Sequence, residues 1–218
     1  MKILALDTAT SACSAALMGD GAIIASALVA MRRGHAEALL PMVDAVMAEA
    51  GIAYGALDLI ATTVGPGAFT GLRVGLAAAR GLALAGGLPI VGVTTLEALA
   101  HAVGADQRGK RPVVAVINAR RDEVYYQPFD AALMPLGPPL VGAAEAIVLP
   151  EGPVLLVGDG ATLLPADRND TEIIPGLLPD AAVVAALAAA RFDPAAPPET
   201  PPEPLYLRGS GAREPASP

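Results

Sequence analysis

The chain has 218 residues, a formal net charge of −8 and a pI of about 4.7, a balance that does not favour a protein built to bind nucleic acid over its whole surface. A single cysteine, Cys13, excludes an internal disulfide framework and fits a reducing compartment. The most apolar segment, 74–93, contains Arg80 and Pro89, which disfavour a membrane span. We therefore expect a cytoplasmic protein.

The first hundred residues predict strands and helices in a regular succession. Short strands are expected at 2–6, 12–18 and 22–29, the last two joined by the tight turn Gly19-Asp20-Gly21. A helix with apolar residues at helical spacing follows and ends at Gly51; Pro41 implies that its regular part starts nearby or kinks there. A buried strand at 57–65, a second helix at 70–85 and a strand at 89–95 complete this half.

The second half begins in the same way, with a strand, a polar turn and a second strand at 123–129. The segment 153–160 then repeats the passage from a strand into a glycine turn, and 180–192 predicts a closing helix. We therefore expect a duplicated α/β fold whose second half is reduced. Its predicted parts are an N-terminal lobe at 1–100, a C-terminal lobe at 101–193 and a proline-rich tail at 194–218.

The glycine-rich stretch "GPGAFTG" at 65–71 raises the question of phosphate binding. It lacks the Gly-Lys-Ser/Thr ending of a Walker loop, and Thr70 stands in place of the third glycine of a dinucleotide fingerprint. What remains is a turn, Thr70 as a candidate N-cap, and a helix in which Gly71, Gly75 and Ala79 are four residues apart. This small-residue stripe allows close approach of another element, which could belong to this chain or to a partner.

The turn after the first strand is a second candidate site. In actin- and hexokinase-like proteins an Asp at this position is followed two residues later by glycine, so that backbone amides can approach phosphate; here that position is Ala9. A capped hairpin turn is the alternative. The candidate remnant of a nucleotide site consists of Asp7, Thr8, Thr10, Gly158 and Gly160.

Residues suited to metal binding or nucleophilic catalysis are sparse. His35 and His101 each stand alone, and Cys13 lies among small residues typical of a buried thiol. The charged turn 120–123 is a candidate for substrate binding, but such a cluster at a hairpin is typical of a solvated turn with ion pairs. We therefore expect neither catalytic residues nor a metal site in this chain.

Several segments, in order, resemble the TsaB (YeaZ) family: "LALDTATSACSAAL", "HAEALLPMVDAVMAEAG", "VGPGAFTGLRVGLAAARGLA", "TTLEALA", "NARRDEVY" and "PLYLR". The resemblance covers about residues 1–208, and Asn118 departs from it where family members usually have Asp. The family comprises non-catalytic subunits of the bacterial machinery that makes threonylcarbamoyladenosine at position 37 of tRNAs. It implies a reduced actin/hexokinase-like fold with two lobes.

The resemblance also implies partners. A larger catalytic homologue, TsaD, carries the metal-binding histidines, and an ATPase subunit, TsaE, joins the pair; ATP and a metal ion then belong to those subunits, and tRNA is reached only through the complex. Helices near 39–50 and 70–85 would pack against the equivalent pair of TsaD, or of a second copy when TsaD is absent. The expected interface residues are Leu39, Leu40, Val43, Val46, Met47, Gly71, Leu72, Gly75 and Ala79.

Three alternatives come from different classes of protein: an independent nucleotide-dependent enzyme of the same fold, a peptidase, and a direct tRNA-binding protein, which conflicts with the net charge of −8. Ala9 and the missing phosphate-binding lysine count against the first. The absence of a Cys–His, Ser–His or metal constellation in the sequence counts against the second.

Overall fold

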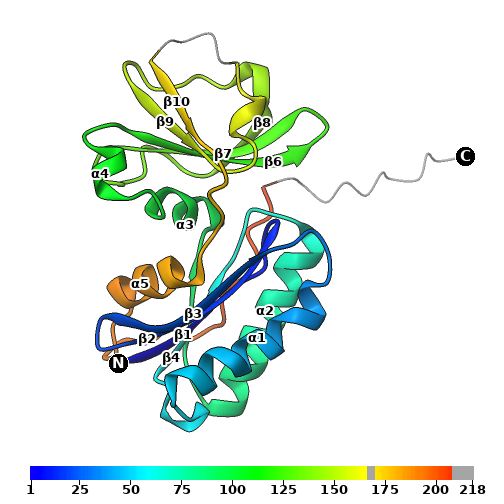
Figure 1. The fold of residues 1–218 in the computed structure, drawn as a ribbon, viewed down its shortest axis with the longest axis vertical. Coiled ribbons are helices and arrows are strands. Elements are labelled where there is room, and N and C mark those ends of the chain that lie inside the picture. The colour runs from blue at the N-terminus through cyan, green and yellow to red at the C-terminus, as the bar shows by residue number, and fades with distance from the viewer. Residues whose placement is uncertain (166–169, 208–218) are drawn as a thin grey trace, which may run out of the picture.

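The computed structural model describes residues 1–165 and 170–207, which form two lobes, each built on one five-stranded sheet (Figure 1). The first sheet has the strand order β3 (Ala22–Ala30), β2 (Ala12–Gly19), β1 (Lys2–Asp7), β4 (Leu59–Thr63) and β5 (Ile90–Val93). The second has the order β8 (Leu140–Ala143), β7 (Glu123–Phe129), β6 (Val113–Arg120), β9 (Val154–Val157) and β10 (Thr171–Ile174).

The two sheets share one topology. In the first, β1, β2 and β3 form an antiparallel meander, and β4 and β5 then add in parallel on the other side of β1. In the second, β6, β7 and β8 form the meander, and β9 and β10 add in parallel beside β6. This one-to-one correspondence confirms the duplicated α/β fold that the sequence predicts.

Helices cover both faces of the first sheet. The long helices α1 (His35–Ala50) and α2 (Phe69–Gly86) pack on one face, and α5 (Ala181–Arg191) packs on the other. Helix α5 follows the second sheet in the chain but buries Ala181, Val184 and Ala188 against the first. Part of the segment expected to form the C-terminal lobe therefore belongs to the core of the N-terminal lobe.

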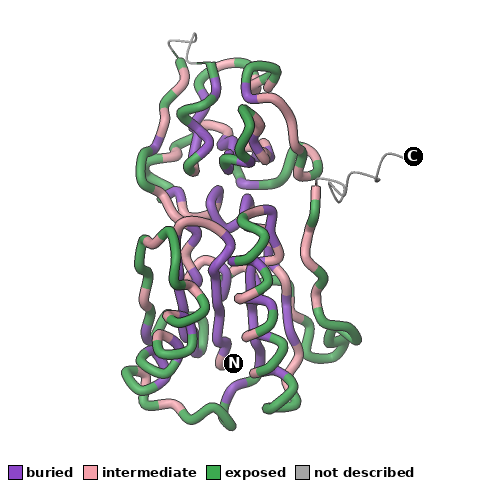
Figure 2. Tube along the Cα trace, turned by 90° about the vertical axis from the view of Figure 1, so that its right-hand side faces the viewer, coloured by how far each residue is buried: buried purple, intermediate pink, exposed green. Residues whose placement is uncertain are grey.

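The second lobe is less completely covered. Helix α3 (Thr95–His101), with a capping box between Thr94 and Glu97, packs on one face of its sheet. The short helix α4 (Ala105–Arg108) follows, and in the part of the chain that the structure describes the opposite face carries short 3-10 turns alone, η2 (Ala144–Ala146) and η3 (Ala161–Leu163). A third such turn, η1 (Tyr54–Ala56), precedes β4. Figure 2 shows the buried strands at the centre of each lobe.

The two long helices begin differently from expectation. Helix α1 starts at His35 and runs through Pro41, which lies on its exposed side. Helix α2 starts at Phe69 with Ala68 as its N-cap, so the prediction that Thr70 caps it is wrong. The carbonyl of Ala68 already accepts the N–H of Leu72 at 2.9 Å, which places Thr70 inside the first turn. Among the described residues, no helix has the length and apolar character needed to cross a membrane.

The C-terminal segment returns to the N-terminal lobe as an extended strap, residues 193–207 (Figure 1, orange to red). The Leu205 N–H donates to the Val64 carbonyl at 2.7 Å, and Arg80 donates to the Pro202 carbonyl at 2.7 Å. The ring of Tyr206 lies 5.7 Å from that of Phe69. The strap thus joins α2 to the end of β4; the rest of the predicted tail, 208–218, lies outside the described residues.

Candidate functional site in the cleft between the lobes

The glycine-rich loop packs against the turn that follows β1. The Ala68 N–H donates to the Ala9 carbonyl at 2.7 Å, and the Thr8 hydroxyl donates to the Gly71 carbonyl at 2.7 Å. A Cβ atom on Gly67 or Gly71 would overlap the carbonyl of Ala9 or Thr8. The glycines therefore serve a close approach between two backbone segments of this chain.

The small-residue stripe of α2 faces inward in the same way. A Cβ on Gly75 would lie 2.6 Å from the hydroxyl oxygen of Thr8, and Ala79 is fully buried against the sheet. The element that approaches this stripe is therefore the β1–β2 turn with β4.

This packing corrects the expected partner interface. Of its members, Leu40 alone is exposed, at 51%, because it lies to one side of the buried arc of α1. The wide apolar arc of the two helices is used to cover the sheet and the neighbouring helix. The remaining expected interface residues are buried within the chain: Leu39, Val43, Val46, Met47, Gly71, Leu72, Gly75 and Ala79.

The candidate nucleotide residues have different surroundings. Asp7 and Thr8 are buried beneath the turn, and Thr10 lines the cleft described below. Gly158 and Gly160 pack against β6, where a Cβ on Gly160 would lie 2.8 Å from the carbonyl carbon of Ile117. On the N-terminal side, two backbone donors that a phosphate would need are already used, because the Ala9 N–H donates to Asp7 and the Ala68 N–H donates to the Ala9 carbonyl.

Asp7 is a fully buried carboxyl at the end of β1. One oxygen accepts the Thr63 hydroxyl at 2.6 Å and the Ala9 N–H at 3.2 Å, and the other has no hydrogen-bond partner among the described residues. Burial raises the pKa of Asp7 to about 7; the hydrogen bonds from Thr63 and Ala9 oppose the shift, and the charge of Asp180 adds to it. Asp7 therefore ties β1 to β4 and carries a proton over most of the acidic pH range.

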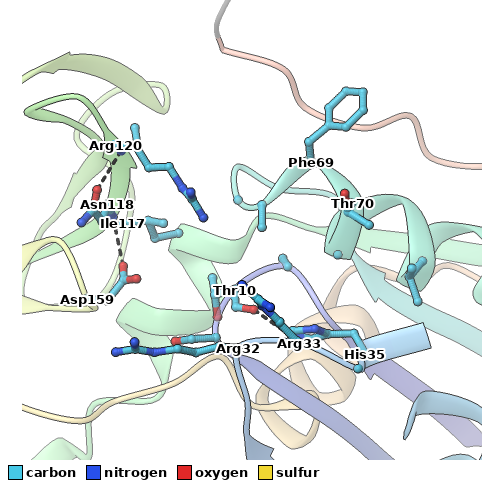
Figure 3. A pocket seen from close by; sticks show the side chains of 18 of the residues that line it. Thr10, Arg32, Arg33, His35, Phe69, Thr70, Ile117, Asn118, Arg120 and Asp159 are labelled. Carbon is cyan, nitrogen blue, oxygen red and sulfur yellow. Dashed lines mark hydrogen bonds between the residues drawn. The ribbon is translucent and has the colours of Figure 1, made fainter. Parts of the chain in front are cut away.

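A cleft of about 1110 Å³ separates the lobes (Figure 3). Its N-terminal side is made by the β1–β2 turn, residues 32–37 ahead of and within the start of α1, and the start of α2. Its other side is made by the end of β6, Tyr125 and Asp159. The Nε2 atom of His35 lies 3.1 Å from the Thr10 carbonyl and links the start of α1 to the turn.

Charged side chains from both lobes line this cleft. Arg32 and Arg33 lie on the N-terminal side, and Figure 3 shows Arg120 extending towards them from the other lobe. Two carboxylates, Glu37 and Asp159, line it as well. Sequence reasoning did not single out Arg32 and Arg33; an adjacent pair of arginines just ahead of a helix, in an acidic chain, is the signal that could have found them.

The hairpin that carries Arg120 has an unusual backbone. Arg120, Arg121 and Asp122 all have left-handed φ angles, 65°, 57° and 62°, a conformation that costs on the order of 1 kcal/mol or more for a non-glycine residue. The Asn118 side chain accepts the Arg120 N–H at 2.7 Å, and Asp159 accepts the Asn118 N–H at 2.9 Å. Asn118 therefore helps to fix Arg120 at the lip of the cleft.

The other candidate reactive groups, Cys13 and His101, are at least partly buried, and burial shifts the pKa of each towards its uncharged form. Burial raises the pKa of the Cys13 thiol to about 11, which keeps it protonated at neutral pH. Burial lowers the pKa of His101. Within the part of the chain that the structure describes, no three His, Cys, Asp or Glu side chains are grouped so as to hold a metal ion.

Comparisons with known proteins identify the family. Residues 29–136 match the family model described as TsaD, tRNA N6-adenosine threonylcarbamoyltransferase. The tRNA threonylcarbamoyladenosine biosynthesis protein TsaB of Escherichia coli is 42% identical over 126 residues, which is 58% of this chain and 54% of that protein. The alignment thus spans about half the length of this curated relative. A tRNA N6-adenosine threonylcarbamoyltransferase of Erythrobacter litoralis is 51% identical over 65 residues, which is 30% of this chain and 19% of that protein.

Two matches cover more of the chain. An uncharacterized protein of Mycobacterium tuberculosis is 35% identical over 157 residues, 71% of this chain and 70% of that protein. The solved structure of YeaZ from Pseudomonas aeruginosa is 35% identical with a TM-score of 0.81, and the match covers 94% of this chain and 99% of that one. On this shared sequence and fold, the chain belongs to the TsaB (YeaZ) family.

Proposed function

We propose that the chain is a non-catalytic subunit that pairs with a TsaD-type transferase for the threonylcarbamoylation of adenosine 37 of tRNA. The observation that carries the proposal is the match of residues 29–136, which include α1 and α2, to the transferase family model. Two chains with related α1–α2 layers can pack these layers against each other about a pseudo-twofold axis. In this proposal a TsaE-type ATPase completes the complex, and ATP and the metal ion bind to the partner subunits.

The surface proposed for this pairing is the outward side of α1 and α2. The six residues that define it are exposed and small or apolar, so another helix pair can approach closely there, and the exposed charged residues Asp44 and Arg80 lie beside them. A Cβ on Gly81 would meet nothing within 4 Å, in contrast to Gly75 on the inward side. We call this surface the outer helix face and define it by Pro41, Ala45, Ala48, Ala77, Gly81 and Ala85.

The outer helix face is proposed as the partner interface in place of the residues expected from the sequence, which are mostly buried within the chain. On α2 it forms a second small-residue stripe with the same four-residue spacing, Ala77, Gly81 and Ala85, turned towards solvent. The same face would pair two copies of this chain when the transferase is absent, because a twofold contact uses one patch twice.

The experiment measures affinity for the transferase by calorimetry. Ala77→Arg places a long charged side chain on the outer helix face and is expected to weaken binding at least tenfold. Ala186→Arg is the matched control, since Ala186 is an exposed alanine of α5 on the opposite side of the first sheet. Circular dichroism should show both variants folded. Undiminished affinity of a folded Ala77→Arg variant would contradict the proposed interface.

A further inference from the structure

The cleft between the lobes concentrates positive charge in an otherwise acidic chain. The whole chain has 14 Lys and Arg against 22 Asp and Glu, yet three arginines face two carboxylates in the cleft. One of those carboxylates, Asp159, already accepts the N–H of Asn118. Among the described residues, no salt bridge engages Arg32 or Arg33. The charge of these two arginines is therefore available to an anion.

The backbone adds N–H groups, whose partial positive charge has the same sign as the charge of the arginines. Both long helices begin at this cleft, and neither α1, with Gly34 at its N-cap, nor α2, with Ala68, has a side-chain cap. Uncapped N–H groups and the positive end of the helix dipole favour negative charge. The helix ends support the arginines rather than forming a site by themselves.

Aromatic rings accompany the arginines. Phe69 and the partly buried Tyr125 both line the cleft, but Figure 3 shows the Phe69 ring pointing away from Arg32 and Arg33. The Arg73 guanidinium stacks over the Phe69 ring at 3.7 Å from its centre, and Tyr206 of the strap packs beside it, so Tyr125 is the ring considered for stacking. Cations that follow a backbone and an aromatic ring on which a base stacks are the two components of single-stranded nucleic-acid binding.

From this combination we propose that the cleft directly binds an RNA strand, with Arg32 and Arg33 contacting its phosphates and Arg120 facing it from the other lobe. A free nucleotide fits less well because two backbone donors of the turn that would hold its phosphates are already used: the Ala9 N–H donates to Asp7 and the Ala68 N–H to the Ala9 carbonyl. The arginines also come from opposite sides of a cleft of about 1110 Å³, which has room for an extended ligand. A strand that crosses between the lobes meets both sides.

The proposal rests on the proposed function only for the identity of the RNA as tRNA. Binding of a tRNA transcript to the full chain is measured by fluorescence anisotropy at low salt, where phosphate contacts are strongest. We expect the double variant Arg32→Glu/Arg33→Glu to lower the affinity at least tenfold. It should also make the salt dependence shallower, by a slope of roughly one for each phosphate that the altered side chains no longer bind.

Lys110→Glu is the control, and it is compared with the single variants Arg32→Glu and Arg33→Glu, each of which changes the net charge by the same two units. Lys110 is an exposed cation that precedes β6, at the opposite end of this strand from Arg120. Its affinity for the transcript should stay within twofold of the unaltered chain. An equal loss in Lys110→Glu would show that net charge alone governs binding, and would overturn the proposal. Competition by ATP as effective as that by an RNA oligonucleotide would overturn it too, because the cleft would then be a nucleotide pocket.

The outcome is separable from that of the proposed function. Ala77→Arg should keep the RNA affinity, and Arg32→Glu/Arg33→Glu should keep the affinity for the transferase, since the two surfaces share no residue. A chain that binds the transferase but shows no salt-sensitive RNA binding would overturn the RNA proposal and leave the subunit proposal intact. RNA binding without transferase binding would overturn the subunit proposal and leave the RNA proposal intact.

Discussion

Replacing Asp7 with Asn should change how the stability of the protein depends on pH. The pKa of Asp7 rises from 3.8 to about 7 on folding because of burial, so between these values the folded chain keeps a proton that the unfolded chain has released. The free energy of unfolding of the unaltered protein therefore falls as the pH rises through this window. A shift of about 3 units at about 1.4 kcal/mol per unit makes the total loss about 4 kcal/mol.

Asparagine avoids this loss because it carries no charge at any of these pH values. Its side-chain oxygen can still accept the hydrogen bonds that Thr63 and Ala9 donate to Asp7. Its amide group replaces an oxygen that has no partner among the described residues, which costs about 1–3 kcal/mol. We therefore expect Asp7→Asn to be less stable than the unaltered protein near pH 4, and more stable by about 1–3 kcal/mol at pH 8.

Urea unfolding monitored by circular dichroism at pH 4–8 measures both effects. Glu151→Gln is the control, because Glu151 is an exposed carboxylate and its variant should follow the unaltered protein at every pH. Parallel pH profiles for Asp7→Asn and the unaltered protein would refute the reasoning, since the buried carboxyl would then contribute nothing to the pH dependence.

Two further predictions concern α2 and the strap. Gly75→Leu should lower the free energy of unfolding by at least about 1–3 kcal/mol, because its Cβ would lie 2.6 Å from the Thr8 hydroxyl. Gly81→Leu, the control, should keep the melting temperature of the unaltered protein. Equal melting temperatures of the two variants would place both glycines in the same environment and contradict the prediction. Truncation before Pro202 should lower the melting temperature relative to truncation after Leu207, because it removes the Leu205–Val64 hydrogen bond and the Tyr206–Phe69 ring contact. Identical thermal unfolding of the two truncated chains would contradict a stabilising role for the strap.

The order of strands and helices could be read from the sequence because hydrophobic periodicity and turn residues are local signals. The strands expected at 2–6, 12–18 and 22–29 agree with β1, β2 and β3 to within a residue or so at most ends. The duplication could be read as well, since both halves repeat the same order of elements. The position of α5 could not, because its apolar face suits either sheet and only tertiary packing selects the first.

The direction in which α2 faces illustrates the same limit. Spacing of four residues identifies two small-residue stripes on this helix, one through Gly75 and one through Gly81, but periodicity does not say which of them faces the sheet. The contact of Gly75 with Thr8 decides it. The partner surface expected from the sequence was therefore assigned to the stripe that the chain itself buries, and the proposed surface moves to the opposite side of the helix.

The cleft is harder to predict from the sequence than the orientation of α2, because its residues are far apart in the chain. Arg32 and Arg33 precede α1, and Arg120 ends β6, so nothing local relates them; the lobes bring them to opposite sides of one opening. The glycine loop explains why this opening differs from a nucleotide site. Gly67 and Gly71 let α2 close on the β1–β2 turn and engage the Ala9 carbonyl, while leaving the start of α2 and the exposed Phe69 at the cleft. The contact that uses the Ala68 N–H, a donor that a phosphate would need, thus also positions the start of α2 at the proposed RNA site.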